Sequence, residues 1–337
     1  MTKSTYIAAM GHFHPQNRIT NEFFGELDIG SDSEWVLDRT GIESRHSILD
    51  EETIAKLRHG KTDLSTLRQE GKVTPLAELA CQSWEVLGSR APASFDQSHV
   101  DAVICGTSVP DYDIPANAST ISEKLGLRAA SFDVNSACSS FVMDLHVARG
   151  LVGSGIHDNI AIFNPERYSL RMNYADRQSC VLFGDGCASA LVQDKPQPGS
   201  LKVIDTMVVS DPSNYEAVKI PDSGLFTQNG KVVQKFAISK TIEATREILK
   251  KNDLTPNDIS WFIGHQANLR MITSSAERLG ISKETHLYNV DLFGNQGAAG
   301  APAVVSQNWD KIKTGDLVAI AVVGSGLTWG AALLEKI

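Results

Sequence analysis

The sequence is poor in cysteine, has no long apolar run and carries no excess of positive charge. Its five cysteines among 337 residues are an odd number without a CxxC pair. This favours free thiols in a reducing compartment, the cytoplasm, over a disulfide framework. The longest apolar run near the end, Leu317 to Val323, is too short to cross a bilayer. The opening residues MTKSTYIAAMGHFHP contain no apolar segment typical of a signal peptide, so we expect none.

The net charge and the composition limit the classes of partner that we expect. A net charge of −9 argues against nucleic acid or an anionic membrane as the main partner, but leaves room for a local basic patch that binds a phosphorylated ligand. Hydrophobic residues at 42% and charged residues at 21% are typical of an ordinary globular protein. The nine histidines are scattered without metal-ligand spacing, so we expect no metal site. We interpret His12 and His14 as part of a solvated turn.

The most informative stretch is 131–148, which contains Cys138. Its first half predicts a buried strand, and its second half has apolar residues at helical spacing. Cys138 therefore lies at a strand–helix junction, with Ser136 as a candidate N-cap. Unpaired N–H groups and the helix dipole at such a junction favour the thiolate, which is the nucleophilic form of cysteine. Cys138 is thus a candidate nucleophile, the alternative being an inert core thiol.

Helices and strands alternate along the chain. The segment 50–72 is rich in charge and poor in large apolar residues, so we interpret it as a part-helical, surface-exposed insertion. The patterns predict helices at 33–41, 75–87, 117–126 and 240–251, and strands at 100–108, 159–164, 180–193 and 260–265.

The second part of the chain repeats the first. Glu123-Lys-Leu-Gly126 resembles Glu277-Arg-Leu-Gly280, and Phe132-Asp-Val-Asn135 resembles Tyr288-Asn-Val-Asp291. These and further pairs keep an almost constant offset of roughly 150 residues, which indicates an internal duplication. Chance likeness between βα units does not explain that constant spacing.

The duplication predicts two α/β halves with mostly parallel sheets, residues 1–195 and 200–337. The second-half counterpart of Cys138 is the loop that contains Asn295, and His265 ends a second-half strand. Ligand sites in such sheets gather at the carboxyl ends of strands. We therefore expect the side chains of Cys138, His265 and Asn295 to converge where the halves face each other.

Several motifs together carry a resemblance to a known family. They are Ala137-Cys138-Ser139, Gly264-His265-Gln-Ala-Asn268-Leu-Arg270, Gly294-Asn295, Gly324-Ser325-Gly326-Leu-Thr-Trp-Gly330, Phe183-Gly-Asp-Gly186 and Trp35…Arg39-Thr40-Gly41-Ile42. In this order they resemble the β-ketoacyl–acyl carrier protein synthase III family of thiolase-fold condensing enzymes. The resemblance covers nearly the whole chain, with 50–72 as the clear departure.

The resemblance implies a thiolase fold, in which two duplicated halves give a layered αβαβα arrangement with mixed, mostly parallel sheets. It implies an acyltransferase whose Cys138 attacks an acyl-CoA and holds the acyl group. A malonyl thioester on acyl carrier protein then loses carbon dioxide and condenses to a 3-ketoacyl product. His265 and Asn295 would stabilise the enolate, and the backbone N–H groups of Cys138 and Ser325 would form the oxyanion hole. The resemblance implies a homodimer and no cofactor, with acyl-CoA as substrate.

The resemblance also implies a coenzyme A site. Trp35 and Arg177 match the pair that encloses the adenine, and Arg39 and Thr40 match positions near the nucleotide phosphates. Asn268 would support the site at one remove. Without the family context, Trp35 is interpreted as a core residue on a helix face and Arg177 as a solvated charge.

Two departures from the family pattern leave the acyl preference open. Ser139-Ser140 follow Cys138 where members of primary metabolism usually have a small residue and Gly, and Ser325 stands where Gly is common. A secondary-metabolite condensing enzyme or acyltransferase of the same family is therefore an alternative.

Other enzyme classes fit the sequence less well. A thiolase needs a second cysteine in the second half, but the last cysteine is Cys187. An HMG-CoA synthase-like enzyme needs a glutamate after the Thr107 strand, where Asp111 and Asp113 occur but no glutamate precedes Glu123. Elongating synthases pair two histidines. A type III polyketide synthase shares Cys-His-Asn but is longer and has a different C-terminal motif. A non-catalytic partner subunit would lack one of the three residues.

Overall fold

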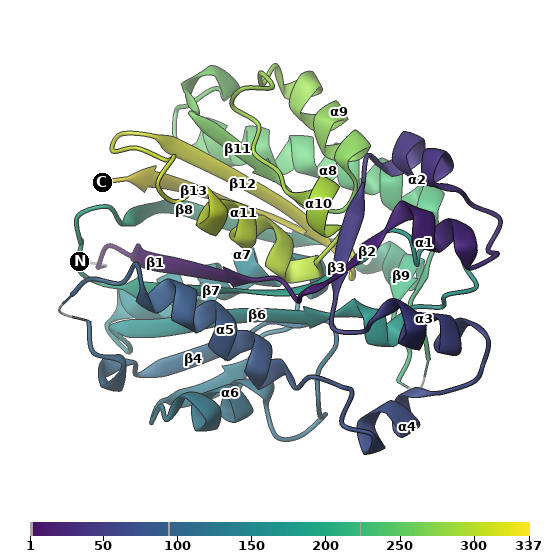
Figure 1. The fold of residues 1–337 in the computed structure, drawn as a ribbon. Coiled ribbons are helices and arrows are strands. Elements are labelled where there is room, and N and C mark those ends of the chain that lie inside the picture. Colours follow the sequence, from purple (N-terminus) through teal and green to yellow (C-terminus); the bar gives the residue numbers. More distant parts are fainter. Residues whose placement is uncertain (1–2, 94, 223) are drawn as a thin grey trace.

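The structure is a computed structural model that describes residues 3–93, 95–222 and 224–337, so Met1 and Thr2 of the opening segment lie outside it. Figure 1 shows strands running across the molecule with helices above, below and between them. The strands are β1 (Tyr6–Phe13), β2 (Asn17–Thr20), β3 (Ser44–Ser47), β4 (Ala102–Cys105), β5 (Ala130–Asp133), β6 (Asn159–Arg167), β7 (Asp185–Gln193), β8 (Leu201–Ser210), β9 (Val218–Lys219), β10 (Thr227–Gln228), β11 (Trp261–Gly264), β12 (Leu317–Gly324) and β13 (Thr328–Lys336).

The predicted helices are present, although one begins earlier than expected. The helix predicted from Lys240 begins at Gly230, because the Asn229 side chain accepts a hydrogen bond from the N–H of Val232 and caps it there. The helices are α1 (Asn21–Glu26), α2 (Ser33–Thr40), α3 (Glu51–Arg58), α4 (Leu64–Gln69), α5 (Leu76–Gly88), α6 (Asn117–Leu125), α7 (Ser140–Ser154), α8 (Gly230–Lys251), α9 (Leu269–Leu279), α10 (Val290–Phe293) and α11 (Gly300–Gln307).

In the described part of the chain, nine strands form one mixed sheet in the order β11-β12-β13-β8-β1-β7-β6-β4-β5. The mixed sheet is as predicted, but the expectation of mostly parallel pairing is wrong. Three neighbouring pairs are parallel and five are antiparallel. Parallel pairs need a crossover helix. The connections β6–β7, β7–β8 and β12–β13 contain no α-helix. β7 accordingly pairs antiparallel with β6, and β13 pairs antiparallel with β12. β7 and β8 do not pair with each other, but each pairs antiparallel with β1, which lies between them.

The apolar residues sort into layers around this sheet. One core cluster joins α7 and α11 to strands from both parts of the chain, so these two helices lie between the two portions of the sheet. A second cluster packs α5 and α6 on β1, β4, β6 and β7, and a third packs α8 and α9 on β11, β12 and β13. Figure 1 shows these outer helices at opposite sides of the molecule. The result is the predicted αβαβα layering.

The two parts of the chain follow one order of elements. In each part, a long helix precedes a parallel strand, and the next helix ends at a left-handed glycine, Gly126 with φ 69° or Gly280 with φ 76°. The likeness of 288–291 to 132–135 in sequence does not extend to their structure, because β5 ends at Asp133 whereas α10 begins at Val290. These parallels support the duplication, and the division at residues 195–200 stays a prediction.

The predicted insertion 50–72 is only partly exposed. It forms α3 and α4, whose caps Asp50 and Asp63 accept hydrogen bonds from backbone N–H groups. Ile54 and Leu67 are fully buried in the cluster that covers the site from this side. The segment therefore contributes to the core through single apolar residues between charged ones, a pattern that composition alone conceals.

Two further expectations about burial need correction. The strand after residue 130 is not buried, because β5 is an edge strand of the sheet. His12 and His14 are not solvated. The His12 Nδ1 lies 2.8 Å from the Ser306 hydroxyl, and the His14 ring stacks on Phe293 at 3.7 Å between centroids. Burial lowers the pKa of His12 to about 4 and that of His14 to about 3.

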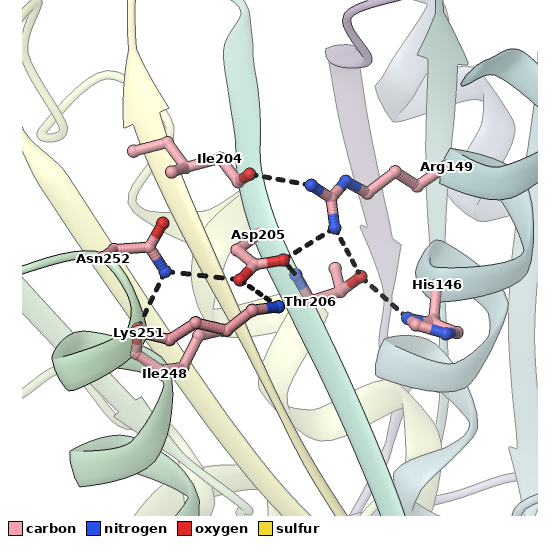
Figure 2. Close-up of polar contacts among 8 residues, drawn as sticks. All are labelled: His146, Arg149, Ile204, Asp205, Thr206, Ile248, Lys251 and Asn252. Atoms are coloured by element: carbon pink, nitrogen blue, oxygen red, sulfur yellow. Dashed lines mark hydrogen bonds and ion pairs between the residues drawn. The ribbon is translucent and has the colours of Figure 1, made fainter. Parts of the chain in front are cut away.

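A buried carboxylate connects the helix that follows Cys138 to the second part of the chain. Asp205 on β8 accepts hydrogen bonds from Arg149 of α7 at 2.7 Å and from Asn252 at 3.3 Å, and pairs with Lys251 at 2.7 Å (Figure 2). Arg149 also donates to the Ile204 carbonyl at 3.0 Å. The network therefore fixes α7 and α8 relative to β8. Among the described residues, none of the helices has the length and apolarity needed to span a membrane.

Candidate active site

One pocket of about 550 Å³ brings the sequence-predicted site residues together. They reach it from opposite parts of the chain: α2, the loop between β6 and β7, the start of α7, the ends of β11 and β12, and the turns before α9 and after α10. The pocket is lined by all nine of them, namely Trp35, Arg39, Thr40, Cys138, Arg177, His265, Asn268, Asn295 and Ser325.

Cys138 lies on a tight turn between β5 and α7. The preceding residue, Ala137, has a left-handed φ of 46°, which is unusual for a residue with a side chain. Cys138 itself is in a short 3₁₀ turn, Ala137–Ser139, directly before α7. Ser136 flanks this turn but does not cap it, because its hydroxyl bonds to the Ser139 hydroxyl at 2.8 Å. The strand–helix junction is therefore confirmed, and the predicted cap is wrong.

The surroundings of the Cys138 thiol disfavour the thiolate in the resting enzyme. Burial raises the pKa of Cys138 to about 12, and the buried charge of Glu166 adds to this effect. The Tyr168 hydroxyl lies 3.4 Å from the sulfur and lowers the pKa only in part. The expectation of a thiolate at the helix start is therefore not met, because burial favours the neutral thiol.

His265 follows the last residue of β11 directly and is buried. Burial lowers its pKa to about 4, so the imidazole is neutral above that pH. Its Nδ1 is buried and has no hydrogen-bond partner among the described residues. A neutral imidazole can donate one hydrogen bond to a developing negative charge without first carrying charge itself.

Asn295 is held by its own turn. Its side-chain oxygen accepts a hydrogen bond from the N–H of Gly297 at 2.9 Å, and its backbone pairs with Phe183 in an isolated bridge. Gly294 before it has a φ of 69°, and a Cβ there would lie 2.9 Å from the Leu182 carbonyl oxygen. Because the amide oxygen is occupied, the amide nitrogen is the group left to donate to a ligand.

The end of β12 lies against the Cys138 turn. A Cβ on Gly324 would lie 2.8 Å from the backbone nitrogen of Ser139 and 2.7 Å from the Ser136 carbonyl oxygen, so only glycine fits. The Ser325 hydroxyl donates to the Val218 carbonyl at 2.5 Å. Among the described residues, the backbone N–H groups of Cys138 and Ser325 donate to no other residue's carbonyl.

The mouth of the pocket is basic and aromatic. The Arg177 guanidinium lies 4.7 Å from the centroid of the Trp35 ring, and that of Arg39 lies 5.0 Å from it. Asn268 caps α9, and its amide nitrogen donates to the Arg39 carbonyl at 3.3 Å. The Thr40 hydroxyl donates to a carbonyl of its own helix.

Sequence reasoning missed two residues behind Cys138, namely Glu166 and Tyr168. Both are buried. The strand was predicted at 159–164, whereas β6 continues to Arg167. A glutamate therefore lies in the continuation of this strand, although it does not line the pocket.

The structure also weighs against the other bases and nucleophiles considered. Asp111 pairs with the buried Arg167 at 2.8 Å and accepts from the N–H of Leu76, so it is engaged in packing. Cys187 is buried on β7 beside the Ser83 hydroxyl at 3.3 Å, away from the pocket lining. Neither is placed to act on a substrate held at Cys138.

The fold, and a pocket lined by a cysteine, a histidine and an asparagine, are those of a thiolase-fold condensing enzyme. Family models described as "3-Oxoacyl-[acyl-carrier-protein (ACP)] synthase III" and its C terminal match residues 132–212 and 249–336. Proteins named β-ketoacyl-[acyl-carrier-protein] synthase III are similar over the full length. That of Rhodobacter capsulatus is 33% identical, covering 99% of this chain and 100% of the relative. That of Azobacteroides pseudotrichonymphae genomovar. CFP2 is 32% identical, covering 98% and 96%.

The solved structures agree. The crystal structure of 3-oxoacyl-[acyl-carrier-protein] synthase III from Aquifex aeolicus VF5 matches with a TM-score of 0.86 at 28% identity, covering 98% of this chain and 99% of that one. The chain therefore belongs to the β-ketoacyl-[acyl-carrier-protein] synthase III family and is an acyltransferase of the condensing type.

Proposed function

We propose that this chain transfers an acyl group from acyl-CoA to Cys138 and then condenses it with malonyl-acyl carrier protein. The condensation releases carbon dioxide and gives a 3-ketoacyl product. The observation that carries this proposal is the single pocket lined by Cys138, His265 and Asn295. It unites a nucleophile with two neutral hydrogen-bonding side chains, the set that a thioester attack followed by an enolate requires.

The roles within the site follow from the groups left free. The amide nitrogen of Asn295 and the neutral imidazole of His265 are the donors proposed to stabilise the enolate oxygen. The backbone N–H groups of Cys138 and Ser325, which donate to no carbonyl among the described residues, are proposed as the oxyanion hole for the acyl carbonyl. No further cofactor is part of this proposal.

Coenzyme A is proposed to bind at the basic mouth. The adenine would enter between Trp35 and Arg177, whose side chains contact each other in this structure. Arg39 and Thr40 on the same helix would lie near the phosphates, with Asn268 holding the Arg39 backbone. This local concentration of cations suits a phosphorylated ligand despite the net charge of −9. A cytoplasmic location, without nucleic acid or membrane as partner, belongs to the same proposal.

We also propose a homodimer formed through the β5 edge. An edge strand presents unpaired backbone groups that its symmetric copy can pair with. The loop after β4 exposes large apolar side chains beside this edge, Tyr112 and Ile114, the latter 87% exposed. Light scattering at micromolar concentration should give the mass of two chains. Ile114→Asp should weaken the dimer, whereas Tyr288→Asp near the β11 edge should not. A monomeric wild-type protein would contradict the proposal.

The decisive test of the function is intact-mass spectrometry after incubation with a panel of acyl-CoAs. We expect one acyl group per chain, mapped to Cys138 by peptide analysis and absent from Cys138→Ala. Cys81 is the other cysteine that is not fully buried, so it is the internal control. Labelling at Cys81, or unchanged labelling of the Cys138→Ala variant, would refute the assignment. The acyl-CoA that reacts fastest identifies the starter.

A further inference from the structure

The hydroxyl groups of buried Tyr168 and half-buried Ser108 lie between the Cys138 sulfur and the carboxylate of Glu166. The sulfur lies 3.4 Å from the Tyr168 hydroxyl. The Ser108 hydroxyl donates to a Glu166 carboxylate oxygen at 3.0 Å, and the Ser108 side chain lies near enough to the Tyr168 phenol to oppose the rise in its pKa. Tyr168 and Glu166 are buried, and neither lines the pocket. The path is thus separate from the face on which substrate binds.

Glu166 is firmly held at the end of this path. Its two oxygens accept from the backbone N–H groups of Ser108 at 3.0 Å and Ala298 at 3.1 Å. The Thr107 hydroxyl adds a contact at 3.4 Å. A Cβ on Gly297 would lie 2.6 Å from a Glu166 oxygen, so the backbone packs directly on the carboxylate. The geometry fixes Glu166 between the loop after β4 and the start of α11.

The thiol needs a proton acceptor because the environment keeps it protonated. Burial and Glu166 raise the pKa of Cys138 to about 12, and burial makes His265 a weak base with a pKa of about 4. Burial raises the pKa of Glu166 to about 7, with hydrogen bonds from Ala298 and Ser108 opposing it. A general base works best when its pKa is close to the working pH.

Few other charges face this carboxylate. The titratable groups that act on Glu166 or are acted on by it are the thiols of Cys138, Cys105 and Cys187 and the phenol of Tyr168. Each of these has a raised pKa and is therefore neutral near pH 7. The ionisation of Glu166 is then the event that sets the charge behind Cys138 at that pH.

We propose that Tyr168, Ser108 and Glu166 form a buried proton path that takes the Cys138 thiol proton as the sulfur attacks the acyl-CoA. This inference rests on the proposed function and assigns a base to its first step. Tyr168 is the member that touches the reacting sulfur. Glu166 acts through the two hydroxyls and is the final acceptor.

The step balances without any further reactant. The Cys138 sulfur forms a bond to the acyl carbonyl carbon, and the bond from that carbon to the coenzyme A sulfur breaks with its electron pair on coenzyme A. The thiol proton passes to the Tyr168 oxygen as the Tyr168 proton passes to Ser108 and the Ser108 proton to Glu166. When the acyl group later leaves for the enolate, the Cys138 thiolate regains the proton along the same path.

The test is single-turnover acylation by the acyl-CoA that the wild-type enzyme accepts, measured from about pH 5 to 9 on Tyr168→Phe. This change removes one oxygen and keeps the ring that stacks on Phe183. The control is Tyr174→Phe, a buried tyrosine whose hydroxyl donates to the Ser169 carbonyl. We expect Tyr168→Phe to slow acylation on the order of 10²-fold, the usual share of general base catalysis, and Tyr174→Phe to leave it unchanged.

The pH profile separates a proton path from mere positioning of the sulfur. Wild-type acylation should rise through a pKa near 7, and this rise should be lost in both Tyr168→Phe and Glu166→Gln. Wild-type rates in Tyr168→Phe, or a loss that is uniform in pH with the rise intact, would overturn the proton path. If the wild-type protein accepts no acyl group from any acyl-CoA, it is instead the proposed function that fails.

Discussion

The Arg177 guanidinium lies face-on to the Trp35 indole, 4.7 Å from the ring centroid. Arg177 also donates to the Gly30 carbonyl, so the loop before β7 contacts both α2 and the turn that precedes it. A planar base can take the place of either partner, because an aromatic face stacks equally on a base or a guanidinium. Trp35 and Arg177 are therefore the two walls of a slot for a planar base. In the structure described here, these two side chains contact each other.

Removing either wall of this slot should weaken acyl-CoA binding. We expect Trp35→Ala and Arg177→Ala each to raise the apparent KM for acyl-CoA about 10-fold, equivalent to roughly 1.4 kcal/mol. The condensation rate of enzyme that is already acylated should be unchanged. Arg246→Ala, which removes an exposed arginine on the outer helix α8, is the control. An unaltered KM in the double variant would rule out the site.

Asp205 should matter for stability rather than for chemistry (Figure 2). Replacing it with Ala removes hydrogen bonds from Arg149, Lys251 and Asn252, and we expect a loss of about 2–3 kcal/mol in the free energy of unfolding. Asp158→Ala removes an exposed ion pair with Lys3 and should change the free energy of unfolding far less, because solvent screens this pair. Urea unfolding of both variants makes the comparison.

The same carboxylate gives the stability a pH dependence of known sign. Burial raises the pKa of Asp205, but the hydrogen bonds from Lys251 and Arg149 outweigh it, so the net shift is downward. A lowered folded-state pKa stabilises the protein above the unfolded value of about 3.9 and ceases to do so as the pH falls below it. The difference between wild type and Asp205→Asn should therefore shrink below about pH 4. A constant difference down to the lowest pH would contradict this assignment.

The Cys138 thiol should react slowly with alkylating reagents. With a pKa of about 12 against an ordinary value of about 8.5, its thiolate fraction at pH 7 is lower by roughly three to four orders of magnitude. Iodoacetamide reacts with thiolate that has already lost its proton to water, and Glu166→Gln removes the negative charge that contributes to the raised pKa, so we expect faster alkylation in that variant. Its acylation should be slower, because the proton acceptor is lost. Alkylation by iodoacetamide, mapped to Cys138, measures the first effect, and equal rates in the two proteins would contradict it.

Local patterns predicted the positions of the site residues well. Cys138 at a strand–helix junction and His265 at the end of β11 follow from apolar runs bounded by turn residues. The helix bearing Trp35 is closed at Gly41 as its sequence indicates, with a φ of 68°. These features depend on neighbours in sequence, which is why sequence reasoning finds them.

Features set by contacts across the fold were beyond the sequence. The raised pKa of Cys138 depends on desolvation by residues far along the chain, and no local pattern contains it. The strand predicted at 159–164 is shorter than β6, in which Pro165 lies opposite Cys187, and the prediction did not include Glu166 and Tyr168. The residues around Phe132 predicted a buried strand, but β5 lies at the edge of the sheet. In each case, tertiary pairing overrides what the local residues favour.

The proposed roles differ, because Cys138 takes up the acyl group whereas His265 and Asn295 stabilise the enolate. This difference gives the sharpest test of the condensing step. Asn295→Asp keeps the acceptor for the Gly297 N–H but replaces the donating amide nitrogen with a second acceptor. His265→Ala removes the other donor. Losing one such donor typically costs on the order of 10²–10³ in rate. We expect each variant to lose decarboxylation of malonyl-acyl carrier protein by about this factor while acylation of Cys138 stays near the wild-type rate.

Carbon dioxide release and 3-ketoacyl product, followed beside single-turnover acylation, separate the two steps. His265 should add no pH dependence to decarboxylation between about pH 6 and 8, because burial lowers its pKa to about 4 and it is neutral throughout. A change in the decarboxylation rate near pH 6.5 that is absent from His265→Ala would mean that the charged imidazole takes part. If either variant blocks acylation as strongly as condensation, the two donors serve the first step as well, and the roles proposed here are wrong. If the wild-type enzyme joins two non-malonyl thioesters equally well, the enolate does not arise by loss of carbon dioxide.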